Sequence, residues 1–319
     1  MNIVPAVRKL DFTEIPVVDV SPFVSGDETY RAEAVAALSD ACENIGFVYV
    51  KNHGVPRDVL DAVVRETKLF FDLPHAEKMS VAVEKSPQFR GFLPLEYGGT
   101  RAGGKDKKGP NLQEAFIIMP DRPVGEKNPL DGPNQWPETL PSLKSAMLAY
   151  DKAITKFGYQ MLKAFSLTLG QKPDFFDAYY TRPTLMLKLN HYPPQPPLTS
   201  AQKIGVKGHT DGGGFTILWQ DDQGGLEILN KHGDWVGVPP IDGTFVINIG
   251  DMMQRWSGNR FISTQHRVVN VSGNERYSIP LFMNPDFSAV IKAVNGDDAE
   301  EPYESGKFLF EKYHRIYPQ

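Results

Sequence analysis

From Leu185 onward the chain consists of short β-type runs separated by turn residues, and this pattern limits the possible folds more than any other feature. Val, Ile, Phe, Tyr and Trp fill the runs, while Gly, Asn, Asp and Pro interrupt them. Many short strands at close spacing are typical of a β-sandwich or a jelly roll. The predicted strands are Leu185–Tyr192, Phe215–Gln220, Leu226–Leu229, Trp235–Val238, Phe245–Ile249, Ile262–Thr264, Arg267–Val271 and Tyr277–Met283.

The part of the chain before Leu185 has a mainly helical pattern. Apolar residues recur every three or four positions in three segments, which predicts amphipathic helices there. The predicted helices cover residues 30–45, 55–74 and 140–169, with a last helix at 308–317 and short strands at 15–20 and 47–50.

These elements predict a mixed α+β protein. We expect residues 1–175 to form a helical and mixed N-terminal region that packs on a core domain of residues 176–319. The strand pattern predicts that this domain is a sandwich or a jelly roll, followed by a C-terminal helix. No Gly/Ser-rich or charged linker separates the two parts.

Composition excludes several classes of partner. The formal net charge is −5, so neither nucleic acid nor anionic lipid would be attracted by charge. No apolar run approaches the roughly 18 residues that a membrane span requires, and the first residues lack a long apolar signal segment. The single cysteine, Cys42, cannot form an intramolecular disulfide. We therefore expect a cytoplasmic protein without nucleic-acid or membrane partners, either a monomer or a weak homodimer.

Three residues are candidate metal ligands. Residues two apart on a strand point to the same side, so His209 and Asp211 can face one ion from a strand end. His266 can join them from a second strand that folds back. Two imidazoles and one carboxylate are the ligand set of a facial triad, which leaves coordination positions open on a non-haem Fe(II). A lone His-x-Asp also occurs by chance, and structural histidines are common, so the ligands alone leave both interpretations open.

Arg276 and Ser278 are candidates for binding a carboxylate. They share a strand face, and the guanidinium can pair with both carboxylate oxygens while the hydroxyl adds a donor. A buried arginine needs an anionic partner, either a ligand or an internal acid. Both remain possible from the residues alone. A metal with open positions and an anion-binding pair together indicate an oxygenase that consumes a keto acid.

The strand Leu185–Tyr192 alternates between two faces. Its leucines are expected in the core, so the opposite face should line the cavity. Asn190 and Tyr192 could bind the co-substrate there. Lys188 would indicate an anionic or hydroxylated substrate, or would form a salt bridge in the cavity wall. Further candidates for the substrate pocket, each of which could equally be core, are Met186, Phe92, Tyr97, Phe282 and Phe287.

Several longer runs resemble a known family. LNHYPP (189–194), GHTDGGGFTILWQDDQGGLEI (208–228), FVINIGDMMQRWSGNRFISTQHRVVN (245–270) and ERYSIPLFMNPD (275–286) are similar to the isopenicillin N synthase-like 2-oxoglutarate- and Fe(II)-dependent oxygenases. IPVVDVSPF and ACENIGFVYVKNHGVP resemble the family's N-terminal region. The resemblance covers nearly the whole chain. Many relatives have a Cys where this chain has Gln195, a position outside the catalytic residues.

The resemblance implies a double-stranded β-helix core and an oxidoreductase. His209, Asp211 and His266 would bind Fe(II). Arg276 and Ser278 would bind the distal carboxylate of 2-oxoglutarate, assisted by Tyr192 and Asn190. A small organic molecule would be hydroxylated, desaturated or cyclised with O2, with release of succinate and CO2, and ascorbate is a further candidate cofactor. The alternatives are an Fe(II) oxidase of the same fold that does not consume 2-oxoglutarate, and a non-catalytic ligand sensor.

Overall fold

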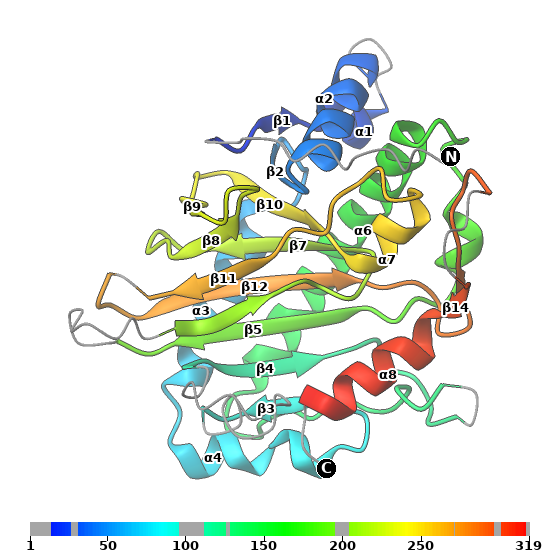
Figure 1. The fold of residues 1–319 in the computed structure, drawn as a ribbon. Helices are drawn as coiled ribbons and strands as arrows, with labels where there is room; N and C mark the ends of the chain where they lie inside the picture. Colours follow the sequence, from blue (N-terminus) through cyan, green and yellow to red (C-terminus); the bar gives the residue numbers. More distant parts are fainter. Residues whose placement is uncertain are drawn as a thin grey trace.

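The protein is built on two β-sheets that face each other, with helices on the outer side of the larger sheet (Figure 1). The computed structural model describes residues 14–26, 31–95, 112–125, 128–194, 204–270, 272–296 and 301–316. The larger sheet has the strand order β1-β2-β10-β7-β12-β5-β4-β3, and the smaller has the order β6-β11-β8-β9.

Apart from the consecutive pair β8 and β9, strands of the C-terminal half alternate between the two sheets along the chain, and their pairings are antiparallel. This alternation is the predicted double-stranded β-helix. In the larger sheet lie β5 (Met186–Tyr192), β7 (Phe215–Gln220), β10 (Thr244–Ile249) and β12 (Arg276–Met283). In the smaller sheet lie β6 (Ile204–His209), β8 (Leu226–Leu229), β9 (Trp235–Gly237) and β11 (His266–Val269).

The N-terminal region extends the larger sheet on both sides. β1 (Val17–Asp19) and β2 (Phe47–Lys51) lie beyond β10, while β3 (Gly91–Leu93) and β4 (Glu114–Ile118) lie beyond β5. β2 pairs with β10 and β4 pairs with β5, both antiparallel. Residues 1–175 and 176–319 therefore share one continuous sheet.

The helices bury the outer face of the larger sheet. The longest is α6 (Pro141–Thr168), which starts with Pro in its first turn and passes behind the sheet in the view of Figure 1. Its buried stripe includes Leu143, Met147 and Ile154, as the sequence pattern predicts. The other helices are α1 (Ser21–Ser25), α2 (Arg31–Asn44), α3 (Arg57–Phe71), α4 (His75–Ser80), α7 (Asp251–Trp256) and α8 (Ser305–Ile316), with short 3-10 turns η1 (Val83–Lys85) and η2 (Asp177–Tyr179) and a small hairpin of β13 (Val290–Ile291) and β14 (Tyr303–Glu304).

The space between the two sheets is only partly apolar. A small hydrophobic cluster that includes Tyr192, Leu226, Ile228 and Val268 fills one part of it. The main core lies between the larger sheet and the helices. The rest of the space between the sheets is lined by polar and charged side chains, which form the candidate site.

Two kinds of difference separate the structure from the sequence prediction. Ile262–Thr264 is not a strand: Ile262 N–H donates to the Cys42 carbonyl and the Thr264 hydroxyl donates to the Ile45 carbonyl, so this segment fastens the end of α2. The strands β3, β4 and β6 and the helix α7 were not predicted. In the described part of the chain, no helix has both the length and the apolarity of a membrane span.

Candidate functional site

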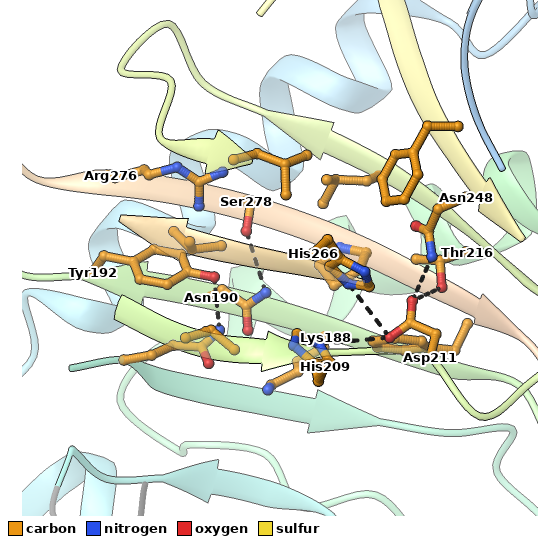
Figure 2. Close-up of a pocket in the computed structure, with 18 residues that line it drawn as sticks. Lys188, Asn190, Tyr192, His209, Asp211, Thr216, Asn248, His266, Arg276 and Ser278 are labelled. Carbon is orange, nitrogen blue, oxygen red and sulfur yellow. Dashed lines mark hydrogen bonds and ion pairs between the residues drawn. The ribbon is translucent and has the colours of Figure 1, made fainter. Parts of the chain in front are cut away.

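His209, Asp211 and His266 come together at one end of the space between the sheets (Figure 2). His209 ends β6 and His266 begins β11, where the two residues pair directly across the strands. Asp211 follows β6 by two residues. Each of the three offers a ligand atom, and these atoms lie within 4.8 Å of one another. Within the described residues they are the one group of this kind.

Backbone carbonyls fix the tautomer of both imidazoles. His209 Nδ1 lies 2.8 Å from the Lys207 carbonyl, and His266 Nδ1 lies 3.2 Å from the Thr264 carbonyl. A carbonyl only accepts, so each Nδ1 carries the proton and each Nε2 keeps its lone pair. Both Nε2 atoms lie 3.8 Å from Asp211 Oδ1. The lone pairs and the carboxylate oxygen thus converge on one point.

Asp211 is buried and remains ionised. Burial alone would raise its pKa, but the two imidazoles and two hydrogen bonds outweigh it and lower the pKa to about 2. Thr216 Oγ1 donates to Oδ2 at 2.6 Å and Asn248 Nδ2 donates to the same oxygen at 2.8 Å. Burial and the neighbouring His266 lower the pKa of His209 to about 4, so its imidazole is neutral at pH 7. The ionised carboxylate of Asp211 and the neutral imidazole of His209 are therefore available to bind a metal ion rather than protons.

Arg276 lies at the other end of the same cavity (Figure 2). The side chain is 1% exposed, and its Nε and Nη2 donate to the Gly224 carbonyl at 2.5 Å and to Gln220 Oε1 at 3.2 Å. Its Nη1 is buried and has no hydrogen-bond partner among the described residues. No carboxylate in the described residues lies within ion-pair distance of it, and the Asp221 carboxylate interacts with it only over a longer distance. A buried guanidinium with a free donor fits an anionic ligand.

Ser278, Asn190 and Tyr192 surround this guanidinium. Ser278 and Asn190 pair across β12 and β5, and Asn190 Nδ2 donates to Ser278 Oγ at 3.2 Å. Arg276 pairs with Tyr192 and lies 4.7 Å from its ring centre. Asn190 Oδ1 is a second buried atom without a partner. The cavity joining these residues to the three candidate ligands has a volume of about 110 Å³, and its polar groups suit a short dicarboxylate that reaches from arginine to metal.

A second cavity of about 400 Å³ opens beside the candidate ligands, towards α8. Lys188, Met186 and Phe282 all line it, as predicted for the cavity face of β5 and for the pocket wall. Burial lowers the pKa of Lys188 to about 8, against the opposing effect of Asp211, and its amine forms no ion pair with any described residue. The wall salt bridge that the sequence left open is therefore absent from the described residues.

Two other predicted pocket residues, Phe92 and Phe287, lie elsewhere. Phe92 is fully buried against Phe70 and the ammonium of Lys78, away from both cavities, so the prediction of a pocket role was wrong and the residue belongs to the core. Phe287 packs against Gly306 at the start of α8 and lines neither cavity. Tyr97 lies outside the described residues.

Four groups that shape the site were not predicted from the sequence. Thr216 and Asn248 bind Asp211, while Gln220 and the Gly224 carbonyl bind Arg276. Thr216 and Asn248 could have been found from the sequence, because each is a polar residue inside an otherwise apolar strand, FTILW and FVINI respectively. A Cβ on Gly213 or Gly214 would overlap Asn284 or Tyr180, so these residues permit close packing.

Two family models match the chain. The model described as non-haem dioxygenase in morphine synthesis N-terminal covers residues 15–139, and the model of the 2OG-Fe(II) oxygenase superfamily covers residues 183–285. The second match contains all the candidate ligands and Arg276.

Individual relatives agree with the family models. The chain is 34% identical to a 2-oxoglutarate-Fe(II) type oxidoreductase, hxnY, of Emericella nidulans, over 86% of this chain and 81% of the relative. It is 32% identical to a homoarginine-6-hydroxylase of Glycine max, over 89% of each. Among solved structures, a full-length Neurospora crassa protein in complex with alpha-KG superposes with a TM-score of 0.85 and 29% identity, over 98% of this chain and 99% of that one.

The relatives are 2-oxoglutarate-dependent enzymes, and the Neurospora crassa protein was crystallised with this co-substrate. Neither a 2-oxoglutarate-independent oxidase nor a non-catalytic sensor is favoured by these matches. The double-stranded β-helix, the matching family models and these relatives agree, and the chain belongs to the isopenicillin N synthase-like 2-oxoglutarate- and Fe(II)-dependent oxygenases, as a dioxygenase that uses Fe(II), 2-oxoglutarate and O2.

Proposed function

We propose that His209, Asp211 and His266 bind the Fe(II) of this dioxygenase and that Arg276 binds the distal carboxylate of its 2-oxoglutarate. The observation that carries this proposal is the pairing of converged, lone-pair-bearing ligand atoms with a buried guanidinium whose Nη1 has no partner, at two ends of one cavity. Two imidazoles and a carboxylate suit Fe(II). When bound, the iron and 2-oxoglutarate supply the oxidising chemistry.

The residues around Arg276 would hold the co-substrate in one orientation. The Ser278 hydroxyl and the free Nη1 would donate to the distal carboxylate, and Tyr192 and Asn190 would limit its position from β5. Gln220 and the Gly224 carbonyl fix the guanidinium from behind. Such a rigid clamp directs the keto-acid end of the molecule to the three ligands and reduces the entropy lost in the reaction.

The substrate is a small organic molecule in this proposal, bound in the cavity of about 400 Å³ that Lys188, Met186 and Phe282 line. Structural neighbours were crystallised with small molecules: the Neurospora crassa protein with thymine and JOX2 with JA. The net charge of −5 disfavours nucleic acid as a partner. We also propose a monomer or weak homodimer in the cytoplasm, where the buried free thiol of Cys42 and Fe(II) would both stay reduced.

An anaerobic spectroscopic titration tests the proposed roles. Fe(II) and 2-oxoglutarate added to the wild type should give a weak visible charge-transfer band, and Asp211→Ala should abolish it. Arg276→Leu should keep Fe(II) binding but weaken 2-oxoglutarate at least 10-fold, because a charged hydrogen bond is worth roughly 1.5–3 kcal/mol. Arg57→Leu is the matched control, since Arg57 pairs with Asp61 on the exposed side of α3. An unchanged band in Asp211→Ala, or equal losses in the two arginine variants, would contradict the assignment.

A further inference from the structure

The larger cavity has an unusual balance of charge. Two lysines, Lys188 from β5 and Lys312 from α8, are among the described residues that line it. Asp211 is the single carboxylate among these described lining residues. Asp211 is already committed to two imidazoles and two hydrogen bonds, and Fe(II) would neutralise it further. The cavity is therefore cationic on the side that faces a substrate.

The amine of Lys188 has no partner among the described residues. It lines both the narrow cavity and the larger one, so it stands where co-substrate and substrate would meet. An ammonium inside a largely buried cavity is costly unless an anion accompanies it. The distal carboxylate of 2-oxoglutarate already has Arg276 of β12, which pairs with Tyr192 at the far end of β5 from Lys188.

Lys312 of α8 lies next to the segment that carries Asp211. Its Nζ donates to the Thr210 carbonyl at 3.3 Å, and its side chain packs directly on Gly212, where a Cβ would collide with it. An ammonium has three donors, so two remain for a ligand. α8 thus brings a second cation to the cavity, next to the segment that carries Asp211.

The rest of the cavity wall is apolar. Met186, Val206, Phe282 and Leu309 supply most of it. Pockets of this kind bind ligands with an apolar body and orient them by a few polar groups.

We propose that the substrate is a small organic anion whose carboxylate or phosphate group is bound by Lys188 and Lys312 and whose apolar body contacts Phe282 and Leu309. This inference rests on the proposed function, because it takes the adjoining cavity to hold 2-oxoglutarate. The inference narrows the substrate class to organic acids, a class that the fold alone does not specify.

The test compares charged and neutral probes of one shape. The full-length protein is loaded with Fe(II) and 2-oxoglutarate without oxygen, and binding of phenylacetate, phenyl phosphate, phenylacetamide, octanoate and octanamide is measured by calorimetry. At least one anion should bind the wild type about 10-fold or more tightly than the matching neutral probe. Lys188→Met and Lys312→Met should each reduce that preference about 10-fold and leave the amides unchanged. Lys163→Met, which removes an exposed charge from α6, is the matched control and should change nothing.

The outcomes distinguish a failure of the anion-binding inference from a failure of the proposed function. If no anion binds more tightly than its neutral partner, or if the preference survives in both lysine variants, the inference is wrong. It is equally wrong if Lys188→Met weakens only 2-oxoglutarate, because the amine would then serve the co-substrate. Preference for phenyl phosphate or for the carboxylates identifies the head group. A wild type that gives no charge-transfer band contradicts the proposed function itself, whereas a normal band without anion preference contradicts the inference alone.

Discussion

Asp211 uses its two carboxylate oxygens for different contacts. Oδ1 faces the Nε2 atoms of His209 and His266, while Oδ2 accepts hydrogen bonds from Thr216 and Asn248. The two donors hold the carboxylate plane and keep the group ionised before any metal arrives. Groups that orient metal ligands in this way commonly change metal affinity by about 10–100-fold when they are removed.

We therefore expect Thr216→Val to weaken Fe(II) binding about 10–100-fold, since it keeps the shape of the side chain and removes the donor to Asp211. Thr216→Ser keeps the hydroxyl and is the matched control, with affinity near that of the wild type. Anaerobic Fe(II) titration followed by the 2-oxoglutarate band measures both. Equal affinities of the Val and Ser variants would show that the hydroxyl does not orient the ligand.

Sequence reasoning found the residues whose chemistry is visible in a short motif. His209 and Asp211 are two positions apart, as are Arg276 and Ser278, and the structure places each pair on one side of its chain segment. Thr216 and Asn248 were not predicted, because their proximity depends on the register of β7 against β10, in which these two residues pair. Phe92 was placed wrongly because an aromatic residue suits a core and a pocket wall equally well.

At the scale of elements, β5 joins the site to the rest of the molecule. One face carries Lys188, Asn190 and Tyr192 into the cavity. On the other face, His191 Nδ1 lies 2.7 Å from Glu114 on β4. Lys78 of α4 donates to both oxygens of Glu114 at 3.1 Å. This buried cluster fixes β4 and α4 to the strand that lines the site.

Removing one partner of that cluster should lower the free energy of unfolding. Lys78→Met leaves the buried Glu114 without its ammonium, and we expect a loss of about 3 kcal/mol in the free energy of unfolding, the usual order for a broken buried ion pair. Urea denaturation measures it. Lys85→Met removes an exposed lysine and should cost less than about 0.5 kcal/mol. The double change Lys78→Met with Glu114→Gln should recover part of the loss, and a loss as large as in the single variant would argue against the ion pair as its cause.

Elements with a strong apolar period were predictable, and those held by tertiary contacts were not. α6 begins and ends within a residue of the predicted helix, because its apolar stripe is long. β6 was missed since its sequence, IGVKGH, contains two glycines and a lysine, which disfavour a strand. Pairing with β11 stabilises this strand despite the low strand propensity of its sequence. Ile262–Thr264 has strand-like residues, but its backbone N–H at Ile262 binds α2 instead of a neighbouring strand.

At the scale of the whole molecule, the shared sheet decides how the two regions depend on each other. We propose that residues 1–175 and 176–319 are regions of one cooperative unit. Without residues 1–175, β10 would lose β2, β5 would lose β4, and the outer face of the sheet would lose α2, α3 and α6. Unpaired edges and an exposed apolar face are not stable in water.

A fragment of residues 176–319 should therefore fail to fold, whereas the full chain should unfold in a single transition. Near-ultraviolet circular dichroism and urea denaturation test both statements. A fragment with native-like spectra, or two separate transitions in the full chain, would show that the regions are independent domains.

The pH dependence of stability has an identifiable source outside the metal centre. His53 follows β2 and packs on Phe157 of α6 and Phe245 of β10, with ring centres 5.9 and 4.2 Å away. Its Nδ1 accepts a hydrogen bond from the Val55 N–H at 3.1 Å, which only the neutral ring can do. Burial lowers the pKa of His53 from 6.5 to about 4.

Because this folded-state pKa lies below the unfolded one, the unfolded chain binds a proton between pH 6.5 and 4 while the folded chain does not. Stability due to His53 is thus fully present above pH 6.5 and falls as the pH decreases to 4, by at most about 1.4 kcal/mol per pH unit. We expect the free energy of unfolding of His53→Gln, measured by urea denaturation from pH 8 to 4, to fall less steeply in this window than that of the wild type. His232→Gln, at an exposed position, should follow the wild type. Parallel curves for His53→Gln and the wild type would place the acid sensitivity in other groups, of which Glu114, with a lowered pKa, would act only at the acidic end of the range.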